Sequence, residues 1–192
     1  PKEPPPNLPE GRPGGEKDFL KREYFTTMTN AGTPLSPPQR GGREGATRTA
    51  IFTGVFNPFT IGHADIVSRA LNVFDRVVIG IGYNPRKGEE TDVRERTAQI
   101  EKVYKDEPRV TVEAYSDMAA DLAARHNATA VVKGVRSVKD FEYERSQAEY
   151  NSMLGGGLET VVFFARPELA ALSSSAVRTL QYFGKDVSKF LP

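Results

Sequence analysis

The sequence predicts an α/β protein: a doubly wound parallel sheet of about five strands with helices on both faces. From Arg48 onward, short apolar runs alternate with longer amphipathic stretches, which is the pattern of strands connected by helices. Most of these short runs are continuously apolar, as expected for parallel strands that are covered on both faces. This part of the chain holds only 5 of the 14 prolines, so few breaks interrupt the alternation.

The order of the elements follows from the positions of these runs. The predicted strands cover residues 50–53, 77–82, 110–114, 130–132 and 160–164. The first helix is predicted from an apolar stripe at 3.6-residue spacing, formed by Ile66, Val67, Ala70, Leu71 and Phe74. Later helices are predicted near 93–104, 117–126 and 138–153. Right-handed crossovers then give a Rossmann-like sheet, with the ligand crevice beyond the carboxyl ends of the strands.

Residues 1–47 differ in composition from the rest of the chain. They contain 9 of the 14 prolines and 7 of the 17 glycines, and they are too poor in apolar residues to form a core. The segment is predicted to be a disordered leader, and its alternative interpretation is a polyproline ligand or tether. Residues 48–192 are predicted to form the folded domain.

Charge and residue usage exclude several classes of protein. The net charge of +1 argues against a protein that coats nucleic acid. The absence of cysteine excludes disulfides, thiolate metal sites and a cysteine nucleophile, and two histidines leave little material for a zinc site. No apolar run approaches the roughly 18 to 20 residues needed to span a bilayer. We therefore expect a soluble cytoplasmic protein without a resident metal ion or a membrane partner.

The loop after the first predicted strand is the best candidate for chemistry. It runs from Gly54 through Pro58 to Gly62 and leads directly into the first helix, where exposed backbone N–H groups favour an anion. His63 lies at the start of that helix and could donate a hydrogen bond to the anion. From the residues alone, a structural histidine packed over the turn is the favoured interpretation.

Two motifs resemble known signatures. The run Thr60-Ile61-Gly62-His63 resembles the T/H-x-G-H signature of the nucleotidyltransferase superfamily, and Ser173-Ser174-Ser175 resembles its C-terminal signature. Further similarity is to the bacterial phosphopantetheine adenylyltransferases, through the runs at 84–87, 134–136, 140–144 and 183–187. The resemblance covers residues 48–192 and does not reach the leader.

This resemblance implies reversible transfer of the adenylyl group of ATP to 4′-phosphopantetheine, giving dephospho-coenzyme A and pyrophosphate, with Mg²⁺ as cofactor. It also implies a homohexamer that functions in coenzyme A biosynthesis. By the same resemblance, His63 is the catalytic residue that donates to the α-phosphate. The implied ATP-binding residues are Val55, Phe56, His63, Gly134, Val135, Arg136, Glu144, Ser173, Ser174 and Ser175.

The acceptor side is implied in the same way. The substrate-binding residues carried over from the family are Val55, Lys87, Ala119 and Lys133. Alone, either lysine would be interpreted as a solvated surface residue, and Glu144 as part of a solvated helical face with Asp140, Glu142 and Arg145. The three serines could equally be an ordinary helix cap. His126 has no counterpart in the family and is expected to be structural.

Several positions depart from the family pattern. Val55 replaces a hydroxyl residue, Asn57 replaces Asp, Lys133 replaces Arg, Ser152 stands where Arg is common, and the segment 170–172 lacks an aromatic residue. Three other functions therefore stay open. These are a nicotinamide or nicotinate mononucleotide adenylyltransferase, a paralogue that binds nucleotide without turnover, and a cytidylyltransferase for a small alcohol phosphate. The F-E-Y-E run at 141–144 favours the phosphopantetheine enzyme over the first and third of these.

Overall fold

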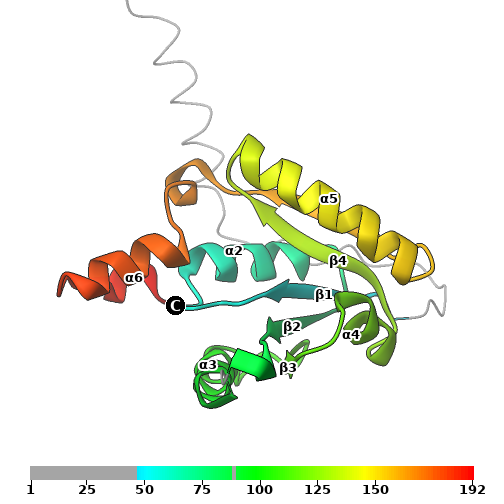
Figure 1. Cartoon of the computed structure of the whole chain (residues 1–192), viewed down its shortest axis with the longest axis horizontal. Helices are drawn as coiled ribbons and strands as arrows, with labels where there is room; N and C mark the ends of the chain where they lie inside the picture. The colour runs from blue at the N-terminus through cyan, green and yellow to red at the C-terminus, as the bar shows by residue number, and fades with distance from the viewer. Residues whose placement is uncertain (1–46, 88–89) are drawn as a thin grey trace, which may run out of the picture. The chain divides into compact units, whose positions relative to one another are not determined.

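A computed structural model describes residues 47–87 and 90–192, and the predicted leader lies outside these residues except for Thr47. Five parallel strands form one sheet in the order β3-β2-β1-β4-β5 (Figure 1). The strands are β1 (Thr49–Gly54), β2 (Arg76–Gly82), β3 (Val110–Tyr115), β4 (Ala128–Val135) and β5 (Glu159–Phe164). All five predicted strands are confirmed. β4 is longer than predicted because Lys133, Gly134 and Val135 continue to pair with β5.

The helices follow the strands in the predicted alternation. They are α2 (Ile61–Ala70), α3 (Glu90–Val103), α4 (Ala119–Arg125), α5 (Val138–Leu154) and α6 (Ser174–Tyr182). Short 3₁₀ turns lie at Pro85–Lys87, Pro167–Leu169 and Ser188–Phe190. Two residues of the predicted stripe lie beyond α2: Leu71 caps the helix and Phe74 packs into the core from the following turn. No helix in the described part of the chain is long and apolar enough to cross a membrane.

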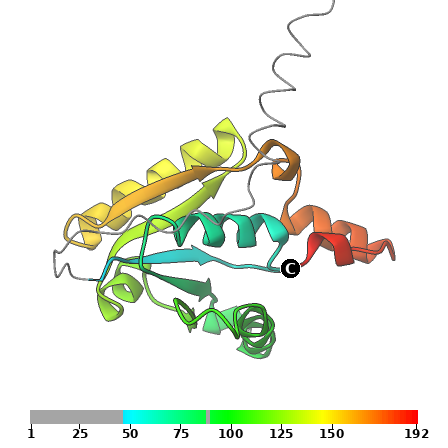
Figure 2. The ribbon, with the colours of Figure 1, turned by 180° about the vertical axis from the view of Figure 1, so that it is seen from behind.

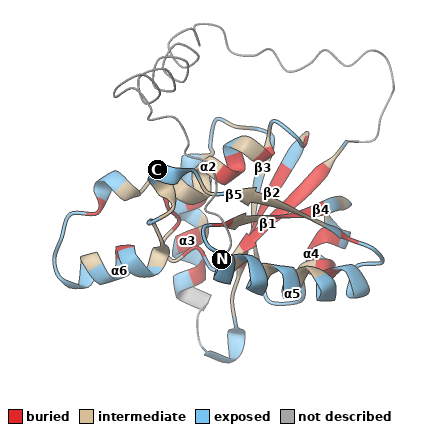
Figure 3. Cartoon of the chain, turned by 90° about the horizontal axis from the view of Figure 1, so that it is seen from above, coloured by how far each residue is buried: buried red, intermediate tan, exposed pale blue. Residues whose placement is uncertain are grey.

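Alternation along the strands builds a separate core on each face of the sheet. Ala50 and Phe52 of β1 pack with residues of α2 and α3, including Val67 and Ile100. Ile51 points to the opposite face and packs with α4 residues such as Leu122 and with Leu158, which precedes β5. In Figure 3 strands β1 and β2 are largely buried and the edge strands β3 and β5 are mostly of intermediate exposure, whereas α5 and α6 expose much of their surface. Helices therefore cover both faces, as predicted.

The strand order determines where a ligand can bind. β1 and β4 are neighbours in the middle of the sheet, yet α2 follows β1 on one face and α5 follows β4 on the other (Figure 2). At such a switch point the two connections diverge and leave a crevice at the carboxyl ends of the strands. The loop after β1 and the end of β4 both lie at this edge, and the start of α6 joins them.

Candidate active site

A cavity of about 740 Å³ occupies this crevice. Its walls come from the end of β1 and the loop after it, from α2, from the end of β4 with the first half of α5, and from the segment that leads into α6. The predicted site residues that line it are Val55, Phe56, His63, Lys133, Gly134, Arg136, Glu144, Ser173, Ser174 and Ser175. The fold thus brings together segments separated by more than a hundred residues in the sequence.

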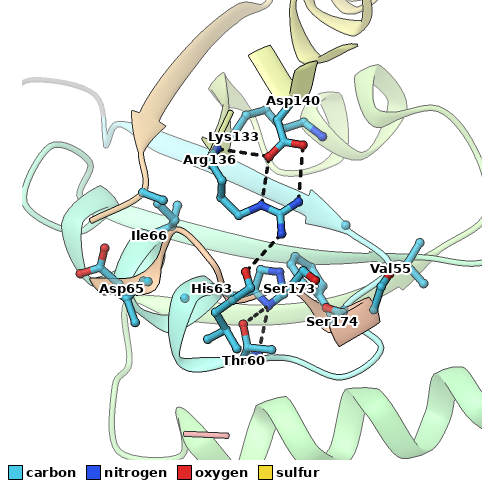
Figure 4. A pocket seen from close by; sticks show the side chains of 18 of the residues that line it. Val55, Thr60, His63, Asp65, Ile66, Lys133, Arg136, Asp140, Ser173 and Ser174 are labelled. Atoms are coloured by element: carbon cyan, nitrogen blue, oxygen red, sulfur yellow. Dashed lines mark hydrogen bonds and ion pairs between the residues drawn. The ribbon is translucent and has the colours of Figure 1, made fainter. Parts of the chain in front are cut away.

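His63 is held in one tautomer by the residue that precedes α2. Its Nδ1 atom accepts a hydrogen bond from the backbone N–H of Thr60 at 3.0 Å and lies 3.1 Å from the Thr60 hydroxyl (Figure 4). A neutral imidazole that accepts at Nδ1 carries its proton on Nε2. Burial, aided by the charge of Arg136, lowers the pKa of His63 to about 4. At neutral pH the cavity therefore contains an uncharged donor.

Two aromatic rings that also contact each other pack against this imidazole. The Phe56 ring lies 5.1 Å from the imidazole centroid in an edge-on arrangement, and the Phe59 ring lies at 5.4 Å. Phe56 has a φ of 49°, in the left-handed region that a bulky residue adopts only under constraint. A Cβ atom at Gly54 would lie 2.9 Å from the Phe56 ring, so glycine is required where the chain leaves β1. The loop conformation and the position of His63 therefore depend on each other.

Side chains from other elements bind backbone carbonyls at the end of β1 and in the loop that follows it. Lys133 lies 3.4 Å from the carbonyl of Thr53, and the hydroxyl of Ser174 donates to that of Pro58 at 2.9 Å. Two guanidinium groups complete the set: Arg96 donates to the carbonyl of Val55, and Arg178 donates to the carbonyl of Asn57. The backbone N–H groups of residues 55–57 make no hydrogen bond to any described residue. The loop is thus fixed through its carbonyls and retains donors for a ligand.

The charges around the cavity favour an anion. The lining includes five basic side chains and three acidic ones: Lys133, Arg136, Lys139, Arg166 and Arg178 against Asp65, Asp140 and Glu144. Asp65 pairs with Arg166 at 2.7 Å and also with Arg69 of its own helix at 3.3 Å. Asp140 pairs with Arg136, and Glu144 pairs with Lys133. The five basic side chains therefore exceed the three carboxylates by two positive charges at the cavity.

Lys133 and Glu144 form an ion pair inside the cavity. The Lys133 amino group lies 3.1 Å from a carboxylate oxygen of Glu144, and the two side chains are only 15% and 18% exposed. The interpretation of Glu144 as part of a solvated helical face is therefore wrong, because the residue points inward from α5 toward β4. The same interpretation holds for Glu142 and Arg145, which are exposed.

Arg136 is likewise engaged by neighbours. Its Nε atom lies 3.0 Å from Asp140, one turn into α5, and another of its nitrogens donates to the carbonyl of Leu172 at 3.2 Å (Figure 4). Arg136 therefore joins the start of α5 to the segment before α6, on the rim of the cavity. An incoming phosphate would share this guanidinium with Asp140.

The serine run combines both of its expected roles. Ser173 caps α6, since its hydroxyl accepts a hydrogen bond from the N–H of Ala176 at 3.0 Å. Ser174 and Ser175 begin the helix and line the cavity. The unpaired N–H groups of the first turn therefore lie where an anion would bind. Before them, Leu172 supplies an apolar wall in place of the aromatic residue of the family pattern.

Three of the predicted binding residues are not among those that line the cavity. Lys87 is exposed at the end of the 3₁₀ turn after β2, Ala119 begins α4, and Val135 is buried in β4. Their assignment stays a prediction. Ser152 lies on an exposed part of α5, so that departure does not alter the cavity. His126 pairs with Glu113 at 2.5 Å outside the cavity, in agreement with a structural role.

Other residues of the site were not identified from the sequence. Arg178 follows Ser174 by four residues, and this helical spacing was the available signal that the two share a face of α6. Asp65 follows His63 by two residues, but nothing in the sequence indicated its ion pair with Arg166. Arg96 lies on α3 and contacts the loop across 41 residues, so no local pattern could have revealed it.

Comparisons with known proteins agree with this geometry. Residues 51–180 match the cytidylyltransferase-like family. A phosphopantetheine adenylyltransferase from Bacteroides fragilis is 48% identical over 145 residues, which cover 76% of this chain and 96% of the relative. One from Methylococcus capsulatus is 40% identical over 75% of this chain and 89% of its own length. The chain belongs to the phosphopantetheine adenylyltransferase family.

Solved structures with the same fold are more distant in sequence from this member of the phosphopantetheine adenylyltransferase family. A Vibrio parahaemolyticus structure assigned as a nicotinate-nucleotide adenylyltransferase has a TM-score of 0.53 at 18% identity, covering 76% of this chain and 94% of that one. A bifunctional NMN adenylyltransferase/ADP ribose pyrophosphatase from Francisella tularensis has a TM-score of 0.57 at 17% identity. The match covers 76% of this chain but only 45% of the bifunctional protein. These similarities identify the fold alone.

Proposed function

We propose that this protein transfers the adenylyl group of ATP to 4′-phosphopantetheine and releases pyrophosphate, forming dephospho-coenzyme A. An oxygen of the acceptor phosphate attacks the α-phosphorus, and the bond from that phosphorus to the oxygen shared with the β-phosphate breaks. The leaving pyrophosphate keeps the bonding electrons. Because the acceptor phosphate is already ionised at neutral pH, the protein needs no general base, and positioning with charge stabilisation is sufficient.

The observation that carries this proposal is the fixed tautomer of His63. Thr60 occupies Nδ1, so Nε2–H is the donor available to an oxygen of the α-phosphate. Its pKa of about 4 keeps the imidazole neutral, so it can donate a hydrogen bond without needing a counter-ion in the resting cavity. Charge that develops on the α-phosphate in the transition state would strengthen this hydrogen bond.

The remaining groups divide between the two substrates. The start of α6, with Ser174, Ser175 and Arg178, fits the β- and γ-phosphates of ATP, and Arg136, which donates to the carbonyl of Leu172 just before the serines, would share them. Lys133 and the N–H of Val55 fit the acceptor phosphate, and the N–H of Phe56 fits a phosphate of ATP. Lys87 and Ala119 would contribute at the acceptor end, beyond the cavity that the described residues enclose.

Mg²⁺ is proposed to enter as part of the substrate, bound to ATP. Among the described residues, no three histidine, aspartate or glutamate side chains form a group that could hold a metal ion. The cavity carboxylates Asp65, Asp140 and Glu144 are each paired with a basic side chain. Such a lining suits a magnesium ion whose ligands are phosphate oxygens and water.

We also propose that the protein is a cytoplasmic homohexamer. Apolar side chains on α5 and at the end of β5 support an assembly: Val138, Tyr150, Met153, Leu154 and Phe164 are each at least 60% exposed. Light scattering of the purified chain measures the mass directly, and a monomer at micromolar concentration would contradict the hexamer. The near-zero net charge supports small-molecule partners rather than nucleic acid.

The decisive experiment is a pyrophosphate-release assay with ATP and Mg²⁺. Release with 4′-phosphopantetheine, and none with nicotinamide mononucleotide, is the expected result. Release with the mononucleotide alone would indicate the other adenylyltransferase activity. Calorimetric binding of ATP without release with either acceptor would indicate a paralogue that binds nucleotide without turnover.

A further inference from the structure

We infer that Arg96 is a positioning residue that fixes both a phosphate-binding N–H and the catalytic imidazole, although it does not line the cavity. The inference rests on the proposed function and extends it to α3, an element that contributes no residue to the cavity lining. Two contacts and the peptide between them carry it. Arg96 donates to the carbonyl of Val55, the Val55–Phe56 peptide links this carbonyl to Phe56, and the ring of Phe56 packs against His63.

Among the described residues, Arg96 is the only charged one that is buried, with 5% of its surface exposed. Its Nε atom donates to the carbonyl of Asp92 at 3.3 Å, and a second nitrogen pairs with the Asp92 carboxylate at 2.9 Å. The third contact is the hydrogen bond to the carbonyl of Val55. Arg96 is thus anchored to its own helix on one side and holds the loop on the other.

Burying a guanidinium group costs desolvation free energy, which the hydrogen bonds and ion pairs of the group must offset. An apolar side chain of similar length would pack at this position without that cost. What only a long, forked donor provides is the simultaneous contact with Asp92 and with a carbonyl on a separate loop. The Val55 contact therefore accounts for arginine at this position.

Holding the Val55 carbonyl determines the direction of the next N–H. The C=O and N–H of a trans peptide point in opposite directions, so the N–H of Phe56 points away from Arg96. This N–H makes no hydrogen bond to a described residue, and Phe56 lines the cavity. The neighbouring carbonyl that Arg178 binds belongs to Asn57, whose peptide leads into Pro58 and has no N–H. Of the two loop peptides whose carbonyl binds a guanidinium group, only the Val55–Phe56 peptide therefore has an N–H that can donate to a ligand. Arg96 sets the orientation of this peptide.

The hydrogen bond from Arg96 to Val55 also affects the position of the His63 imidazole. Phe56 has positive φ, and a rotation of its peptide toward an ordinary conformation would move its ring. That ring packs edge-on against His63 and at a tilt against Phe52, with centroids 5.1 Å away in both cases. Loss of the hydrogen bond from Arg96 to Val55 would therefore displace both the N–H of Phe56 and the Nε2–H of His63. A misplacement of about 1 Å is enough to slow such a reaction by up to about a hundredfold.

The test compares variants of the full 192-residue chain. Arg96→Met removes the donors and keeps the length, Arg96→Lys restores one donor, and Arg94→Met is a matched control at an exposed position of α3. We expect kcat to fall about 10- to 100-fold in Arg96→Met, with KM for ATP within threefold of the parent, and to recover at least severalfold in Arg96→Lys. Arg94→Met should match the parent.

A second readout separates positioning from folding. In ¹⁵N-labelled protein, MgATP should shift the Phe56 amide resonance in the parent and in Arg94→Met, but not in a folded Arg96→Met variant. If Arg96→Met does not fold, Arg96→Lys must show an intermediate shift and an intermediate kcat. A folded Arg96→Met with parental kcat and a parental Phe56 shift would overturn the inference. A parent that binds MgATP without releasing pyrophosphate would count against the proposed function alone, because the amide measurement needs no turnover.

Discussion

The carboxylate of Glu144 lies 3.1 Å from the amino group of Lys133, so the cation expected to hold the acceptor phosphate already has an anionic partner. A phosphate that enters the cavity must compete with this carboxylate or join it. The pair therefore sets the strength of acceptor binding as well as the stability of the empty cavity.

Replacing Glu144 by Gln separates these two effects. Loss of the carboxylate leaves a largely buried ammonium group unpaired and should lower the free energy of unfolding by about 1 to 3 kcal/mol. The freed Lys133 should bind 4′-phosphopantetheine up to about tenfold more tightly, which corresponds to about 1.4 kcal/mol. Urea unfolding and calorimetry measure the two quantities, with the exposed Glu142→Gln as control. Weaker acceptor binding would mean that Glu144 assists the phosphate instead of competing with it.

His63→Ala should lower turnover by about 10² to 10³ with ATP affinity nearly unchanged, because the interaction is strongest in the transition state. Steady-state kinetics and ATP titration measure the two effects. The second histidine provides the control: His126→Asn removes an imidazole that lies outside the cavity and should leave turnover unaffected. Turnover of His63→Ala within a few-fold of the parent would remove His63 from the mechanism.

The low pKa of His63 predicts a specific pH dependence of stability. The folded chain holds this histidine neutral down to about pH 4, whereas an unfolded histidine titrates near 6.5. Between these values the unfolded state binds more protons, so stability falls as the pH is lowered. The loss should reach roughly 2 to 3 kcal/mol between pH 7 and 4.5.

His63→Gln should abolish most of this loss, which urea unfolding at several pH values can measure. The carboxylates whose pKa is lowered, such as Glu107 and Glu113, contribute a loss that begins above their ordinary pKa of 4.5 and grows mainly below it, and this loss is the same in the parent and in His63→Gln. An identical pH dependence in the parent and in His63→Gln would show that the imidazole is not held neutral by the fold.

Much of this architecture could be predicted from the sequence, for reasons that the structure makes clear. Buried parallel strands need continuous apolar runs, and β1, β2, β4 and β5 lie where such runs occur, whereas the edge strand β3 also carries Thr111 and Glu113. The Thr60-to-His63 motif and the serine run are local, so their residues meet the cavity as expected. The Lys133–Glu144 pair was not anticipated because it joins a strand to a helix. The bonds of Arg96 and Arg178 to loop carbonyls leave no trace in the loop sequence.

Val55 offers a direct test of one departure from the family pattern. Its side chain lines the cavity and is 60% exposed, so a hydroxyl there would face the ligand without repacking the core. Val55→Thr should bind 4′-phosphopantetheine up to about tenfold more tightly through one charge-assisted hydrogen bond, with ATP affinity within a few-fold. Calorimetric titration of both ligands decides this, with Val55→Ile as a β-branched control without a hydroxyl. A gain confined to ATP would place Val55 against the nucleotide instead.

Removal of residues 1–46 should leave the melting temperature and the turnover nearly unchanged. The composition of this segment predicts no core of its own, and none of the catalytic motifs lies within it. Differential scanning calorimetry and the pyrophosphate assay compare the full and shortened chains. A decrease of several degrees, or a loss of assembly by light scattering, would show that the leader contributes to the folded protein.

The loop after β1 is held by its carbonyl groups, and every amino acid supplies a carbonyl. Positions 55 and 57 can therefore change identity during evolution without losing the bonds that shape the loop, and this chain carries Val and Asn there. The evolutionary constraint falls instead on the distant donors Arg96, Arg178 and Ser174, whose side chains have no such substitute. Among relatives, we expect the amino acids at positions 55 and 57 to vary and those at positions 96, 174 and 178 to vary little.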